Sequence, residues 1–124
     1  MAYRDLDDAR RHHAALKILI LRHTSGQADL RAVTQLVELA RGAEDAVNDG
    51  YCREKMRLVA EYGAELLAHA EHARWQRPSI SGEQFLKQQV LNALELFQSR
   101  LYSIEAMRRA SARHSLAGFQ FSPR

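Results

Sequence analysis

The sequence has little of the residues that break helices or cross-link a chain. It contains one cysteine, Cys52, two prolines and six glycines among 124 residues. A single cysteine excludes a disulfide within the chain, which suits a reducing compartment, so we expect a cytoplasmic protein. The longest uninterrupted apolar run, Ile18 to Leu21, is far shorter than the ~20 residues of a membrane-spanning helix. We therefore expect no membrane embedding.

The chain also has no large excess of positive or negative residues. The formal net charge is +3, and 15 of the 18 basic residues are arginine. We interpret the abundance of arginine and alanine as the codon usage of a GC-rich bacterial genome. Acidic residues are interleaved along most of the chain, which dilutes any single positive face. The basic balance by itself therefore does not identify nucleic acid as the partner.

Helical periodicity is the strongest pattern present, and β-branched residues are sparse. It predicts helices over about 4–24, from 29 to the Asn48-Asp49-Gly50 sequence, over 51–75 and over 82–114. Asp29 fits an N-cap, and Ser81 with Gln84 fits a capping box. The first helix should bury Leu6, Ala9, His13, Leu16, Ile20 and His23, and the last should bury Leu86, Val90, Leu94, Phe97, Leu101, Ile104 and Met107.

Short connections between long helices make sequential neighbours antiparallel. The sequence therefore predicts an all-α protein, an antiparallel four-helix bundle with a long fourth helix. We expect one bundle domain over residues 1–114 and a flexible C-terminal tail over 115–124. The fourth helix would span roughly 48 Å against roughly 30 Å for the first two, so its last third should overhang or kink.

Apolar residues beyond those needed for one core indicate a protein partner. They lie on the first helix, on the fourth helix and in the expected tail: Ala14, Ile18, Leu21, Leu91, Leu96, Tyr102, Phe119 and Phe121. A helix that is apolar on two faces usually buries both of them. We therefore predict a protein–protein interaction module of the regulator, adaptor or export-chaperone type, which associates with itself as a dimer.

Six histidines support an alternative, a zinc-responsive bundle. Antiparallel topology brings the end of the first helix, the end of the third and the start of the fourth to one end of the molecule. The candidate ligands there are His23, Glu65, His69, His72 and Glu83. Imidazole and carboxylate groups suit zinc or another divalent ion.

A third possibility is non-specific nucleic-acid binding through the arginine-rich end of the fourth helix. The candidate phosphate contacts are Arg100, Arg108, Arg109 and Arg113, and such binding would weaken steeply with salt. The sequence has no P-loop, Gly-rich dinucleotide turn, HExxH or nucleophile elbow. We therefore expect neither an enzyme nor a resident cofactor.

Overall fold

The computed structural model describes the backbone of residues 2–24, 29–72 and 80–121, and the side chains of residues 6–24, 29–72 and 82–112. Four helices make up this part of the chain: α1 (Ala2–Leu21), α2 (Leu30–Gly42), α3 (Gly50–His72) and α4 (Ile80–Phe121). No strand occurs within these ranges. The all-α prediction is confirmed.

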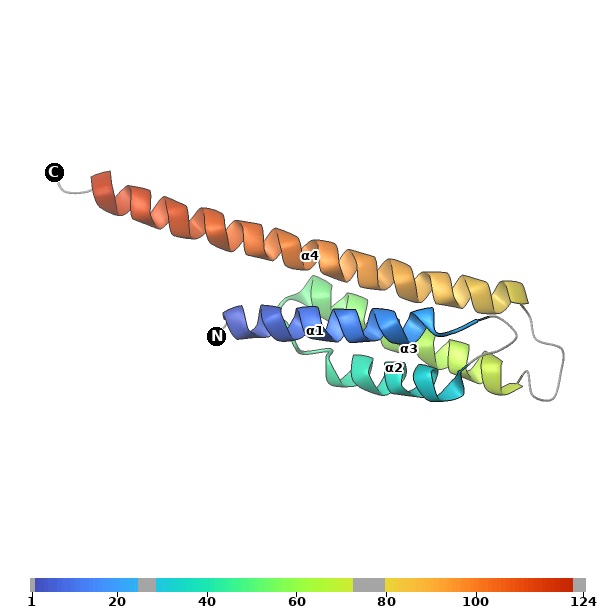
Figure 1. The fold of residues 1–124 in the computed structure, drawn as a ribbon. Helices are drawn as coiled ribbons and strands as arrows, with labels where there is room; N and C mark the ends of the chain where they lie inside the picture. The colour runs from blue at the N-terminus through green and yellow to red at the C-terminus, as the bar shows by residue number, and fades with distance from the viewer. Residues whose placement is uncertain (1, 25–28, 73–79, 122–124) are drawn as a thin grey trace.

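The helices form an antiparallel bundle in which each packs against the two beside it, in the order α1, α2, α3, α4 and back to α1. The α4 helix is far longer than the others, and its C-terminal part extends past the N-terminus of α1 (Figure 1). Most side chains of α4 beyond Glu105 are exposed as far as Ala112. The predicted long, overhanging fourth helix is therefore present.

The core is built from the predicted apolar stripes. All six inward-facing residues predicted for the first helix are buried, although His23 lies beyond the end of α1 at Leu21, and so are the predicted α4 residues from Leu86 to Ile104. Met107 is a correction, because its side chain is 52% exposed. The bundle has ended on that side of α4, so nothing in the described part of the chain covers it.

A buried glycine, Gly63, lies where α3 packs against α2 without room for a side chain. A methyl group at this position would lie 2.6 Å from Leu36 Cδ2 and 3.1 Å from Val37 Cγ2. The small side chain therefore sets the distance between these two helices.

The end of α2 differs from the prediction. The helix stops at Gly42, well before Asn48. Asp49 instead caps the next helix, because its Oδ2 accepts a hydrogen bond of 3.0 Å from the backbone N–H of Cys52. Aspartate and asparagine favour both turns and helix N-caps, so the same residues that indicate a helix end can also begin a helix. At the other end of α2, the predicted Asp29 N-cap is present, and its Oδ1 accepts from Ala32 N–H at 3.1 Å.

The bounds of α4 also differ at both ends. The helix begins at Ile80, so Ser81 lies inside it and is not its N-cap. It continues to Phe121, which places residues 115–121 of the expected tail in helix. The sequence there contains a glycine but no proline before Pro123, and a glycine weakens a helix without ending it. In the described part of the chain, no helix combines the length and apolarity required to cross a membrane.

Candidate protein-binding groove

The seam between α1 and α4 is hollowed along much of α1. Three adjoining hollows of about 410, 130 and 320 Å³ follow one another from the α1 C-terminus toward its N-terminus. His13 and Gln98 line both of the first two hollows, and Arg10 lines both of the last two. The three hollows therefore lie in one row along the seam, and we call this row the seam groove.

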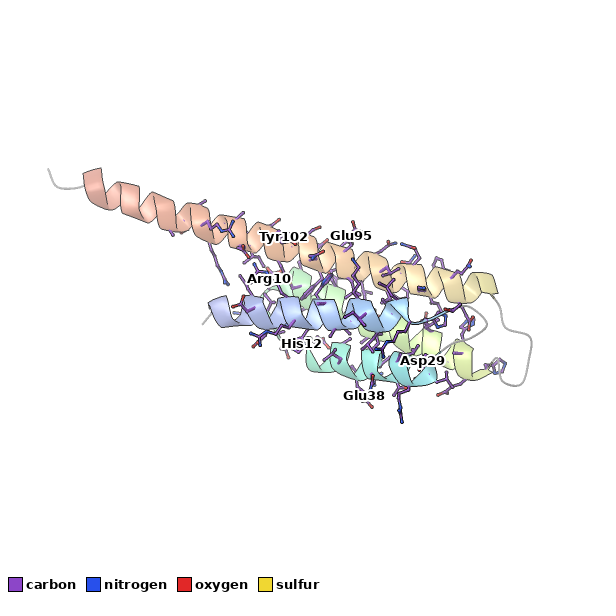
Figure 2. The ribbon with its side chains drawn as sticks, in the orientation of Figure 1. Arg10, His12, Asp29, Glu38, Glu95 and Tyr102 are labelled. Atoms are coloured by element: carbon purple, nitrogen blue, oxygen red, sulfur yellow. The ribbon has the colours of Figure 1, made fainter. Side chains whose placement is uncertain are left out.

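The walls of the seam groove combine apolar and charged side chains. Ala14 and Leu21 come from α1, and Leu91 and Tyr102 from α4. Figure 2 shows Arg10 and Tyr102 on the two helices that border the seam. Lys17 and Glu95 line the groove near the α1 C-terminus. Leu21 and Tyr102 are 54% and 58% exposed, so the groove presents apolar surface to solvent.

At the other end of the groove, near the N-terminus of α1, the lining residues are Asp7, Arg10, Glu105, Arg108 and Arg109. Glu105 forms ion pairs with Arg10 across the seam and with Arg109 along α4. The carboxylate of Glu105 therefore links α1 and α4 near the point where α4 extends past the N-terminus of α1.

His13 lies deep in the seam and stacks on Phe97 of α4, with ring centroids 6.4 Å apart and planes 6° from parallel. Its side chain is 6% exposed. Burial lowers the pKa of His13, and the nearby charge of Lys17 lowers it further. A neutral imidazole therefore packs here as an aromatic ring, which explains why a histidine occupies a core position.

The predicted interface residues separate into two groups. Ala14, Leu21, Leu91 and Tyr102 line the seam groove. Ile18 and Leu96, at 57% and 43% exposure, line none of its three hollows. The side chains of Phe119 and Phe121 lie outside the described residues.

Sequence reasoning missed two exposed apolar residues on α4. Phe85 is 59% exposed and Met107 is 52% exposed. Each lies eleven residues from Leu96, so the helical repeat places it in line with Leu96, and this spacing could have identified both.

The predicted metal ligands lie at one end of the bundle, as expected, but in two environments. His23 and Glu83 are buried at 0% and 1% exposure, and burial lowers the pKa of His23 while the charge of Glu83 raises it. Lys87 Nζ donates a hydrogen bond of 2.8 Å to the backbone oxygen of His23. Glu65, His69 and His72 are exposed. Within the described ranges, no group of three or more histidine, cysteine, aspartate or glutamate residues is placed to hold a metal ion.

The predicted phosphate contacts are partly engaged with carboxylates. Arg100 binds Asp49 through two hydrogen bonds, and Arg109 pairs with Glu105. Arg108 lines the seam groove and is half-buried. The side chain of Arg113 lies outside the described residues.

Cys52 is a core thiol at 1% exposure. Burial raises its pKa to about 12, and the carboxylate of Asp49 contributes to this increase. The thiolate is the reactive form of cysteine. Cys52 therefore fills space and is a poor nucleophile.

Comparison of the chain with protein-family models, with curated proteins and with solved structures found no match.

Proposed function

We propose that this protein is a non-enzymatic protein–protein interaction module that binds an amphipathic helix of its partner in the seam groove. The observation that carries the proposal is the row of three hollows between α1 and α4, along which Leu21 and Tyr102 are exposed. Grooves between helices that mix apolar walls with charged ends suit an amphipathic helix.

The dimensions of the seam groove support a helical ligand. Its lining on α1 runs from Leu6 to Leu21, which corresponds to roughly 23 Å at ~1.5 Å per residue. A partner helix of about four turns would fill this length. Such a helix presents apolar side chains at intervals of three and four residues, and these would contact Ala14, Leu21 and Tyr102.

The charges along the groove favour one direction for the ligand. Arginines outnumber acidic residues where Asp7, Arg10, Glu105, Arg108 and Arg109 lie, so we expect acidic residues on the part of the ligand that binds there. Complementary charge directs the orientation of an encounter more than it increases affinity. The apolar residues should therefore supply most of the affinity.

The test begins with a photo-reactive amino acid introduced at Tyr102 in the native host cells. We expect a specific protein to cross-link from this position and not from Arg57, which is exposed on α3. The captured protein is then purified and its affinity for each variant is measured. We expect Leu21→Glu to weaken binding at least about tenfold, because it buries a charge against an apolar ligand face.

The matched control is Ile18→Glu, which introduces the same charge at an equally exposed residue of α1 outside the groove. It should change the affinity less than about twofold. Equal weakening by the two variants would place the interface elsewhere. Cross-linking from Tyr102 that does not exceed cross-linking from Arg57 would also refute the proposal.

A further inference from the structure

One side of α4, beside α3, carries a row of exposed apolar side chains, the first of which, Phe85, lines a hollow together with Glu65, Ala68 and His69 of α3. Phe85, Leu96 and Met107 follow one another at intervals of eleven residues, which is close to three full helical turns. They therefore lie along one line of the helix, and they are 59%, 43% and 52% exposed. Exposed small or polar residues lie between them, namely Asn92, Ser99 and Ser103. We call this surface the α4 strip.

The α4 strip carries no charge between Phe85 and Met107, in a chain of which 27% of residues are charged. The nearest charges lie at its edges, Glu95 on one side, and on the other Arg100 and Glu65 of α3, which lines a hollow with Phe85. Arg100 is already neutralised by Asp49, 2.9 Å from Nη2 to Oδ1. The face of a helix turned to water normally carries many charged residues. Their absence here indicates a surface that is covered.

A neutral strip can be covered by another copy of itself. In a two-fold symmetric dimer the same patch of both subunits meets, and each residue i of one copy contacts a residue j of the other. A charge within the patch would therefore need an opposite charge at the matching position, whereas a neutral strip meets its own copy without burying an unpaired charge. The small side chains of Ser99 and Ser103 lie near its middle, where they allow two helix backbones to approach closely.

The length of α4 favours an antiparallel arrangement of the two copies. The middle of α4 falls between Arg100 and Leu101. A two-fold axis within about one residue of this point places Leu96 of one copy opposite Met107 of the other. It also places the overhanging C-terminal part of each α4 along the N-terminal half of the other. The overhang, which extends past the N-terminus of α1 (Figure 1), then lies along the second copy.

The area of this contact is sufficient for a reversible dimer. The 42 residues of α4 span roughly 63 Å, and a helix pair shares a seam roughly 10 Å wide. This corresponds to about 600 Å² on each copy and about 1,200 Å² in total, the lower end of the range for specific interfaces. We infer that the protein forms an antiparallel homodimer through the α4 strip, on a face distinct from the seam groove.

The first measurement is sedimentation equilibrium of the full chain over a wide range of concentration. We expect a reversible change from the 14.1 kDa chain to twice that mass. A chain that stays monomeric up to about 0.5 mM would overturn the inference, because specific interfaces of this size dissociate at lower concentrations. A clean trimer or larger assembly would also overturn it.

Leu96→Glu with Met107→Glu tests the surface. The two substitutions place four carboxylates in a neutral interface, so the dissociation constant should rise at least about 100-fold. Both residues are exposed, so the helical circular dichroism should not change. Ile18→Glu and Leu21→Glu, on α1, should leave the dimer intact. A dimer that survives the α4 substitutions, or that is lost with the α1 substitutions, refutes the role of the α4 strip.

This last comparison separates the dimer from the proposed function. Leu21→Glu should weaken partner binding and keep the dimer, whereas Leu96→Glu with Met107→Glu should weaken the dimer and keep the seam groove. Either proposal can therefore fail while the other stands.

Spin labels test the orientation of the copies. Gln84 is exposed on α4 outside the strip, so a label on Gln84→Cys does not enter the contact. The buried Cys52 does not compete for the reagent. In the antiparallel dimer the two labels lie roughly 50 Å apart, whereas a parallel dimer brings them within roughly 30 Å. A distance in the shorter range would contradict the antiparallel arrangement.

Discussion

Arg100 of α4 binds Asp49 at the start of α3 through two parallel hydrogen bonds. Arg100 Nη2 lies 2.9 Å from Asp49 Oδ1, and Arg100 Nε lies 3.2 Å from Oδ2. The same carboxylate accepts a hydrogen bond from the backbone N–H of Cys52. One side chain thus caps α3 and fixes α4 against it, over a separation of 51 residues in sequence. Paired geometry of this kind is specific to arginine.

Asp49→Asn should reveal what the charge contributes, because asparagine can still cap the helix. We expect the free energy of unfolding at pH 7 to fall by about 1–2 kcal/mol, the range for a charge-assisted hydrogen bond that solvent partly screens. The hydrogen bonds from Arg100 lower the pKa of Asp49 to about 2. The stabilisation is therefore complete above the ordinary pKa near 4 and disappears as the pH falls through about 2. Urea unfolding between pH 2 and 7 measures both effects.

The control for this experiment is Asp45→Asn, which removes an exposed ion pair with Arg53. The Asp45 side chain is 83% exposed, so the loss should be below about 0.5 kcal/mol. If the two variants lose the same stability, or if the effect of Asp49→Asn persists unchanged at pH 2, the bond to Arg100 does not stabilise the fold as described.

Two buried histidines should make stability depend on pH near neutrality. Burial lowers the pKa of both His13 and His23, so each is neutral in the folded protein and takes up a proton on unfolding below pH 6.5. Their contribution is complete above that pH and is lost as the pH falls toward the lower folded pKa. The slope that each histidine contributes has an upper limit of about 1.4 kcal/mol per pH unit.

His13→Leu should remove one of these two contributions and flatten the dependence of unfolding free energy on pH between 5 and 6.5. The exposed His69→Leu, on α3, is the matched control. Guanidinium unfolding at four or five pH values measures the slopes. A His13→Leu slope equal to that of the unmodified chain would show that His13 does not remain neutral in the core.

Gly63→Ala should destabilise the bundle, even though alanine is the better helix former. The added methyl group would lie 2.6 Å from Leu36 Cδ2, and overpacking a core usually costs about 1–3 kcal/mol. Gly42→Ala has open space around the added group, so stability should stay the same or rise by up to about 1 kcal/mol. Thermal unfolding of both variants compares the effects. An increase in stability for Gly63→Ala would mean that α2 and α3 separate freely at this point.

The sequence predicted the helices and their buried faces better than their ends. The stripe from Leu6 to His23 and the stripe from Leu86 to Ile104 are both buried as predicted. Apolar side chains that recur every 3.6 residues form one stripe on a helix, and this stripe turns away from water toward the core. Helix ends depend on individual hydrogen bonds, and the types of residue that end a helix also begin one. For this reason Asp49 was assigned to the end of α2, although it caps α3.

The sequence by itself determined that the protein is an all-α bundle with more apolar surface than one core requires. Only the tertiary structure decided where that surplus lies. The packing of α1 against α4 places Leu21 and Tyr102 on a shared groove and leaves Leu96 on a separate strip with Phe85 and Met107. The packing of α3 against α4 brings Arg100 to the carboxylate of Asp49, whereas the sequence analysis named Arg100 as a candidate contact to nucleic-acid phosphate. Periodicity describes one helix at a time, whereas a groove, a strip or an ion pair depends on which helix lies beside it.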